Sequence, residues 1–173
     1  RHFLCGRGAM PAWALDGSVF GFGEMDDRSS RMANWLVARG LVRGDRLCVY
    51  LANCLEFIDL YLAATRLGVI FVPVNVLYRE REIRHILQDA EPKALVTTRS
   101  QVCFVGDCPV PVWMLEDIRV EVVEQSTARR IDVTDGDAPA AIVYTSGTTG
   151  TAKGAVLTHH NFVVNAGNLI TCC

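Results

Sequence analysis

Amphipathic segments alternate with short apolar runs over the first hundred residues, and this alternation limits the fold more than any other feature. The expected helices cover residues 22–40, 55–67 and 80–89, and the expected strands cover residues 46–51, 69–74 and 93–98. Short buried strands joined through helices form parallel pairs whose two faces are both covered. The sequence therefore predicts an α/β fold with a largely parallel sheet flanked by helices.

Glycine and proline mark the ends of these elements. Gly40 closes the first helix and Gly68 follows the second, because glycine adopts without strain the left-handed conformation that often ends a helix. Pro92 marks the end of the third helix. Pro73 has no N–H to donate, so the strand over 69–74 is expected either at an edge of the sheet or with the proline among its last residues.

The rest of the chain has a less regular pattern. Residues 1–19 predict loops and a short strand, with a turn at Asp16-Gly17. The later elements are expected to be a strand near 110–115, a short amphipathic segment over 116–127, a strand over 140–144, and a helix that is capped by Thr158 and runs toward Ile170. Half of the 173 residues are hydrophobic, which is enough for the core of one domain.

The stretch from Tyr144 to Gly154 has the composition of a loop that holds phosphates. It contains five serine and threonine hydroxyls, the glycines Gly147, Gly150 and Gly154, and Lys153. Glycines let the backbone turn sharply and bring its N–H groups close to an anion. A lysine supplies a charge that offsets the charge of phosphoryl oxygens. The stretch is therefore the leading candidate for a functional site.

This stretch differs from the Walker A loop, which ends in Gly-Lys-Ser/Thr and leads directly into a helix. Here Lys153 follows Ala152 and precedes Gly154, and the next residues, 155–157, form a β-prone run. The loop is therefore expected to join two strands, and an unrelated P-loop NTPase is disfavoured. A glycine-rich hairpin turn with an incidental lysine is the alternative without a function.

The order of residues in the stretch resembles the phosphate-loop signature of the adenylate-forming superfamily, Tyr/Phe-Thr-Ser-Gly-Ser/Thr-Thr-Gly-x-Pro-Lys-Gly. The chain matches it except at Ala152, where the family usually has proline. Proline would fix φ just before the lysine. Three earlier segments also resemble the family, Asn53–Phe57, Arg66–Asn75 and the run from Glu82 to Ala90.

The resemblance implies an ATP-dependent acyl-CoA synthetase that activates a carboxylic acid as an acyl-adenylate and transfers it to coenzyme A. The resemblance implies ATP and Mg²⁺ as cofactors and coenzyme A as a co-substrate. Residues 1–173 would be the incomplete N-terminal AMP-binding domain, ending just after the phosphate loop and without the C-terminal domain. The residues implied to bind ATP are Thr145, Ser146, Gly147, Thr148, Thr149, Gly150, Lys153 and Gly154.

Two related alternatives stay open. The chain could belong to an adenylation domain of a peptide synthetase, or it could be a non-catalytic remnant that folds and binds nucleotide weakly. No catalytic residue is assigned, because the family's catalytic lysine belongs to the C-terminal domain. His159-His160 is expected in the first turn of the last helix, and His85 is expected on the surface.

Composition and charge limit the classes of partner that this chain is expected to bind. The net charge of −2 gives no basic surface for nucleic acid or for an anionic membrane. The longest apolar run, over 67–74, is far shorter than the ~20 residues of a transmembrane helix. The seven cysteines include no Cys-x-x-Cys pair, so no metal site is expected. We interpret them as reduced thiols of a cytoplasmic protein.

Overall fold

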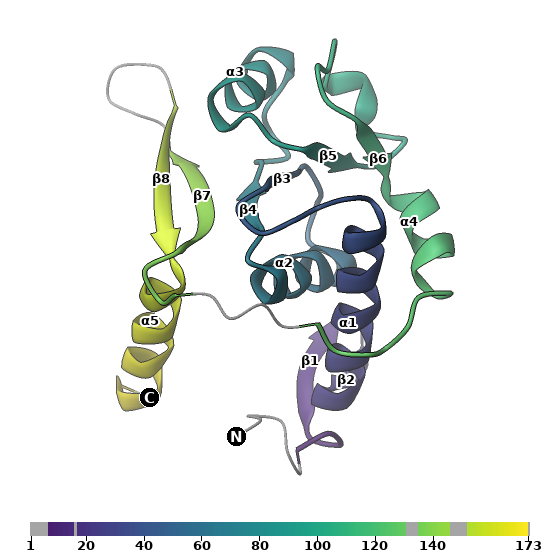
Figure 1. Cartoon of the computed structure of the whole chain (residues 1–173), viewed down its shortest axis with the longest axis vertical. Coiled ribbons are helices and arrows are strands. Elements are labelled where there is room, and N and C mark those ends of the chain that lie inside the picture. Colours follow the sequence, from purple (N-terminus) through teal and green to yellow (C-terminus); the bar gives the residue numbers. More distant parts are fainter. Residues whose placement is uncertain (1–6, 16, 131–134, 146–151, 173) are drawn as a thin grey trace.

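The computed structural model describes residues 7–15, 17–130, 135–145 and 152–172 (Figure 1). The strands are β1 (Pro11–Leu15), β2 (Ser18–Gly21), β3 (Arg46–Val49), β4 (Ile70–Pro73), β5 (Ala94–Thr97), β6 (Val112–Met114), β7 (Pro139–Thr145) and β8 (Lys153–Thr158). The helices are α1 (Phe22–Ala38), α2 (Leu55–Leu67), α3 (Glu80–Ala90), α4 (Leu115–Val122) and α5 (His159–Cys172), with a 3₁₀ turn, η1, over Val102–Phe104. Among these residues, no helix is both long and apolar enough to cross a membrane.

Six strands form the main sheet in the order β6-β5-β3-β4-β7-β8. All neighbours pair in parallel except β7 and β8, which are antiparallel. The α/β fold with a largely parallel sheet is therefore confirmed. Pro73 is the last residue of β4, which lies inside the sheet between β3 and β7. Of the two expected positions, Pro73 thus lies among the last residues of its strand and not in an edge strand.

The sheet separates two apolar cores because side chains of a strand point alternately to its two faces. Leu47 and Val49 of β3 join the core under α1, α2 and α4, whereas Cys48 of the same strand joins the core under α3. On the α3 side the helix contributes residues such as Ile83 and Ile86, both fully buried. Figure 1 shows α3 separated from α1 and α2 by the central strands.

The ends of the helices follow the expected residues closely. Gly68 has a φ of 66° and ends α2, and its N–H is bonded to the carbonyls of Ala64 and Thr65. Gly40, just after α1, has a φ of 83°. α3 ends at Ala90, two residues before Pro92. Local signals in the sequence were therefore sufficient to place these helices.

Two segments differ from the expectation. The strands β1 and β2 pair in an antiparallel arrangement, where only one short strand was expected. The turn expected at Asp16-Gly17 includes Asp16, which lies outside the described residues. α4 ends at Val122 and does not continue to residue 127. Just after α4, Arg31 Nη1 of α1 donates hydrogen bonds to the carbonyls of Val123 (2.5 Å) and Gln125 (2.6 Å).

After α4 the chain runs back along α1 and is fixed there by polar side chains. The Asn34 amide donates to the carbonyls of Ser126 (2.8 Å) and Ala128 (2.9 Å). Asp26, which is buried, accepts from Arg129 Nε at 2.7 Å and from Arg66 Nη2 of α2 at 2.7 Å. One carboxylate thus joins α1, α2 and the segment that follows α4.

The charge of Asp26 is retained because its two partners outweigh its burial. Burial alone would raise the pKa of the Asp26 carboxyl, but the guanidinium groups of Arg129 and Arg66 lower it below its usual value. Asp59, by contrast, is deeper: burial raises its pKa although Arg28 donates to it at 2.6 Å. Folding therefore favours the ionised form of Asp26 and disfavours the ionised form of Asp59.

We predict that Asp26→Asn lowers the free energy of unfolding by about 3 kcal/mol at pH 7, because Arg66 and Arg129 lose their charged partner. A carboxyl whose pKa is lowered by folding stabilises fully above the unfolded-state pKa of about 3.9, and this contribution is lost as the pH falls through the folded-state pKa. The difference in the free energy of unfolding between Asp26→Asn and the wild type, measured by urea unfolding, should therefore become smaller below pH 4. A difference that stays constant down to pH 2 would contradict this, and the exposed neighbour Asp27→Asn is the control.

Candidate functional site

The glycine-rich stretch joins the two strands of an antiparallel hairpin, β7 and β8. Tyr144 pairs with Gly154 in the register, and Thr145 pairs with Lys153. The helix α5 begins only after β8 is complete, so the loop is followed by a strand. This confirms the expected strand, loop and strand, and it is the arrangement that distinguishes the stretch from a Walker A loop.

Three of the residues predicted to bind ATP lie within the described part of the hairpin. Thr145, Lys153 and Gly154 are all exposed, at the end of the hairpin that leads into the connecting loop. The other five lie outside the described residues: Ser146, Gly147, Thr148, Thr149 and Gly150. The assignment of the whole set to ATP binding stays a prediction.

Position 154 has no room for a side chain, because neighbouring side chains pack closely against its backbone. A Cβ atom at this position would lie 2.8 Å from Ile142 Cγ2 and 3.2 Å from Tyr144 Cζ. The aromatic ring of Tyr144 thus lies against the backbone of the opposite strand, directly beside Lys153. The glycine allows this approach because it has no side chain.

Tyr144 also connects the hairpin to α3. Its hydroxyl donates a hydrogen bond to Asp89 Oδ2 at 2.5 Å, and only 8% of the residue is exposed. Burial and the adjacent Asp89 carboxylate together raise the pKa of Tyr144. The phenol therefore keeps its proton at neutral pH and acts as a donor to Asp89.

His85 makes the second connection between α3 and the hairpin. Its Nε2 lies 2.8 Å from the carbonyl oxygen of Ala152, and its ring meets the ring of Tyr144 edge-on with centroids 6.2 Å apart. The expectation that His85 is a surface residue was wrong: it is half-buried against Ala152 and Tyr144 of the β7–β8 hairpin region. Its spacing of four from Asp89 puts both on one helical face, and this was the only signal in the sequence.

The last helix and its cap follow the sequence interpretation. His159 and His160 form the first turn of α5. The Thr158 hydroxyl accepts from the N–H of Asn161 at 3.3 Å, while Asn161 Oδ1 accepts from the N–H of Thr158 at 2.9 Å. The two side chains thus cap the helix reciprocally.

The earlier segments that resemble the adenylate-forming family serve packing in this structure. Glu56 accepts a two-pronged contact from Arg119, with distances of 2.9 and 3.2 Å. Arg66 holds Asp26 as described above, and Asn75 Oδ1 accepts from the N–H of Leu77 at 2.9 Å to close a turn. These residues stabilise the scaffold that carries the hairpin.

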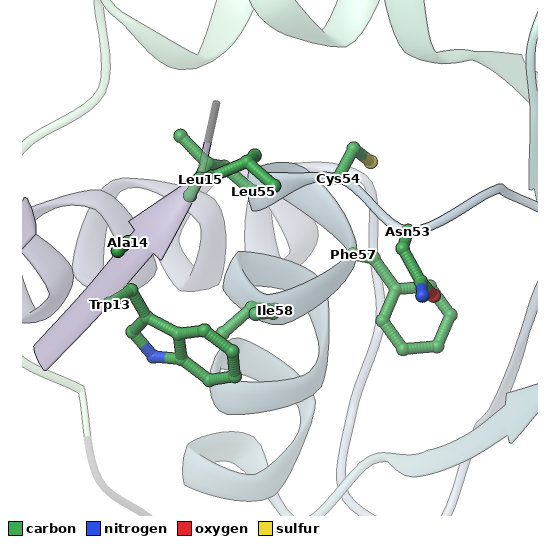
Figure 2. Close-up of a pocket in the computed structure, with 8 residues that line it drawn as sticks. All are labelled: Trp13, Ala14, Leu15, Asn53, Cys54, Leu55, Phe57 and Ile58. Carbon is green, nitrogen blue, oxygen red and sulfur yellow. The ribbon is translucent and has the colours of Figure 1, made fainter. Parts of the chain in front are cut away.

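Apart from the hairpin, a hollow with a volume of about 370 Å³ lies between β1 and the N-terminal end of α2 (Figure 2). Its lining is mainly apolar, and Trp13 and Ile58 face each other across it. Asn53 and Cys54 contribute its polar atoms, and burial raises the pKa of the Cys54 thiol. Among the residues that the structure describes, no charged side chain lines this hollow, which suits apolar groups better than phosphates.

Within the described residues, no group of three or more histidine, cysteine, aspartate or glutamate side chains could hold a metal ion. Cys48, Cys54, Cys103 and Cys108 are free thiols. Burial, followed by the neighbouring Cys108, raises the pKa of Cys48 to about 12, so this thiol stays protonated at neutral pH. Cys48 therefore acts as a small apolar residue of the core.

Comparisons with known proteins agree on one family. The AMP-binding enzyme family matches residues 6–172. The chain is 28% identical over 160 residues to a crotonobetaine/carnitine–CoA ligase of Salmonella heidelberg, covering 82% of this chain. It is 27% identical over 169 residues to a medium-chain fatty-acid–CoA ligase of Escherichia coli, covering 86% of this chain.

Solved structures share the fold. ATP-bound MatB from Rhodopseudomonas palustris superimposes with a TM-score of 0.81 and 35% sequence identity over 90% of this chain. VinN in complex with 3-methylaspartate superimposes with a TM-score of 0.85 at 24% identity. The chain spans 31% of the length of the Salmonella ligase and 33% of the MatB chain.

We predict that Gly154→Ala destabilises the protein by about 1–3 kcal/mol, because the new methyl group overlaps Ile142 and Tyr144. Gly167→Ala is the matched control: nothing lies within 4 Å of a Cβ at that position in α5, and alanine favours a helix by roughly 0.5–1 kcal/mol. Urea unfolding of both variants tests the packing. Equal effects of the two substitutions would show that Tyr144 does not lie against β8.

Proposed function

Because the chain belongs to the AMP-binding enzyme family, we propose that it is part of an ATP-dependent acyl-CoA synthetase and carries the loop that binds the phosphates of ATP. In this proposal residues 1–173 belong to the N-terminal AMP-binding domain of a longer enzyme. Its substrates are a carboxylic acid, ATP and coenzyme A. The two ligases reported above act on different acids, so the acid is left unnamed.

The observation that supports this function best is the hairpin itself. A loop rich in glycine and hydroxyl groups connects β7 to β8, and Lys153 stands at its exit, across the ladder from Thr145. Both side chains are exposed, so they are accessible to a ligand. A relative of similar fold, MatB, has been crystallised with ATP, which fits a nucleotide as the ligand here.

The proposed reaction has two steps. A carboxylate oxygen of the acid attacks the α-phosphorus of ATP, the bond to the β-phosphate oxygen breaks, and pyrophosphate leaves with its electron pair. The thiol of coenzyme A then attacks the acyl carbon and releases AMP. Negative charge moves onto the departing phosphates in the first step, so a cation near them lowers the barrier.

The residues of this chain have the chemistry to bind and orient the phosphates in that step. The Lys153 ammonium offers three donors and a positive charge, and the Thr145 hydroxyl offers one further donor. The backbone N–H groups of a glycine-rich loop surround phosphate oxygens without side chains in the way. Mg²⁺ would come with the nucleotide, since this ion usually binds substrate phosphates together with one or two carboxylates.

We predict that Lys153→Ala in the full-length protein lowers kcat/KM for adenylation by roughly 10- to 150-fold. This loss corresponds to a charge-assisted hydrogen bond of about 1.5–3 kcal/mol. ATP–pyrophosphate exchange in the presence of the carboxylic acid measures the first step alone. Lys93, the other lysine of the chain and an exposed residue, supplies the control: Lys93→Ala should keep the wild-type rate. Wild-type rates in Lys153→Ala would refute the proposed role.

We also predict that the 173 residues alone do not catalyse the reaction. Charge stabilisation requires donors around the whole reacting group and exclusion of water, whereas the described loop ends are exposed. Large apolar side chains of β8 and α5 are exposed as well, among them Val156 (55%) and Ile170 (82%), which favours aggregation. A monodisperse preparation of this chain that releases pyrophosphate from ATP only when an acid is present would overturn this prediction.

A further inference from the structure

The phosphate-loop hairpin is held on α3, an element that lies more than fifty residues earlier in the chain. His85 and Asp89, four residues apart on one face of the helix, each contact one strand of the hairpin. His85 contacts the residue before β8, and Asp89 contacts Tyr144 near the end of β7. The two strands are therefore fixed separately, and by the same helix.

The hydrogen bond between His85 and Ala152 lies directly before Lys153 in the chain. A carbonyl oxygen only accepts, so His85 Nε2 carries the proton and donates it to the Ala152 carbonyl at 2.8 Å. The Ala152 carbonyl belongs to the peptide group that leads into Lys153. Alanine leaves φ of this residue free, where a proline ring would fix it. The hydrogen bond from α3 supplies a restraint that the residue itself lacks.

The contact on the β7 side restrains the opposite strand. Tyr144 is tied to Asp89 through its hydroxyl, and its ring packs against Gly154 as close as a backbone without Cβ allows. The His85 ring lies edge-on to the Tyr144 ring, at an interplanar angle of 84°. The three side chains and the glycine thus form one cluster across the base of the loop.

The helix that carries this cluster is itself firmly seated. Its inner face buries Ile83 and Ile86 completely and Leu87 to 3% exposure in the core beneath the sheet. At its N-terminus, Glu82 Oε2 accepts from the N–H of Arg79 at 3.1 Å, which satisfies one backbone donor at this end of the helix. A buried and capped helix transmits little local motion, so it is a suitable support for a loop.

We propose that His85 and Asp89 are positioning residues that hold Tyr144 and Ala152 in place and so orient Lys153 toward ATP. Neither residue is required to touch the nucleotide: His85 acts through the Ala152 carbonyl and Asp89 acts through Tyr144. This inference rests on the proposed role of Lys153 in binding phosphates. It assigns to α3 a function in substrate positioning in addition to its place in the core.

The test compares His85→Ala with His85→Gln in the full-length protein. Loss of the hydrogen bond to Ala152 should raise KM for ATP by about three- to tenfold, while KM for the carboxylic acid stays unchanged. Glutamine has an amide N–H that can replace Nε2, so His85→Gln should restore most of the affinity. Gln88→Ala, an exposed position on the same helix, is the control and should behave as wild type.

A second variant separates positioning from folding. Ala152→Pro alone should change KM for ATP little, because proline replaces one restraint by another and is neutral or mildly stabilising where φ is near −65°. In the His85→Ala background it should recover most of the lost affinity. Hydrogen exchange of the backbone amides at 153–154 should be faster in His85→Ala and slower again in the double variant.

The outcomes distinguish this inference from the proposed function. If Lys153→Ala has no effect, the proposed function fails. If Lys153→Ala is impaired but His85→Ala has wild-type KM for ATP, only the positioning role is refuted. The positioning role is also refuted if His85→Ala is impaired and neither His85→Gln nor Ala152→Pro restores the affinity, since His85 would then act in another way.

Discussion

The burial of the central strands on both faces is the constraint on which the rest of this structure depends. β3 and β5 carry apolar side chains toward each core, with Leu47 and Val49 on one side and Cys48 and Leu95 on the other. A strand that is apolar on both faces must be covered on both, and the connections from β3 to β4 and from β4 to β5 return through the helices α2 and α3. α3 is the helix on one of these faces, and β7 joins the sheet beside β4, so the hairpin comes to lie next to α3.

Much of this architecture could be predicted because its signals are local. Apolar periodicity, Gly68 at the end of α2 and Pro92 after α3 lie within or next to the elements they define. The order of residues from Tyr144 to Gly154 likewise identified the candidate loop without any tertiary information. The periodicity of apolar side chains is sufficient to predict helices and strands where the backbone is regular.

The support of the loop could not be predicted, because it depends on contacts between distant parts of the chain. His85 meets a residue 67 positions away, and Asp89 meets a partner 55 positions away. The spacing of four between His85 and Asp89 places them on one face of the helix, but it does not identify the element that this face contacts. The contacts just after α4 are also long-range, since Arg31 of α1 donates to the carbonyls of Val123 and Gln125.

The packing of the Tyr144 ring on Gly154 has a consequence for the evolution of the chain. A larger residue at 154 is tolerated only if the ring at 144 is exchanged or displaced, and a smaller residue at 144 leaves a gap over the glycine. The effects of substitutions at the two positions are therefore expected to be coupled and not additive. Among homologous sequences, substitutions at 144 and 154 should occur together, and a flat aromatic ring should accompany glycine.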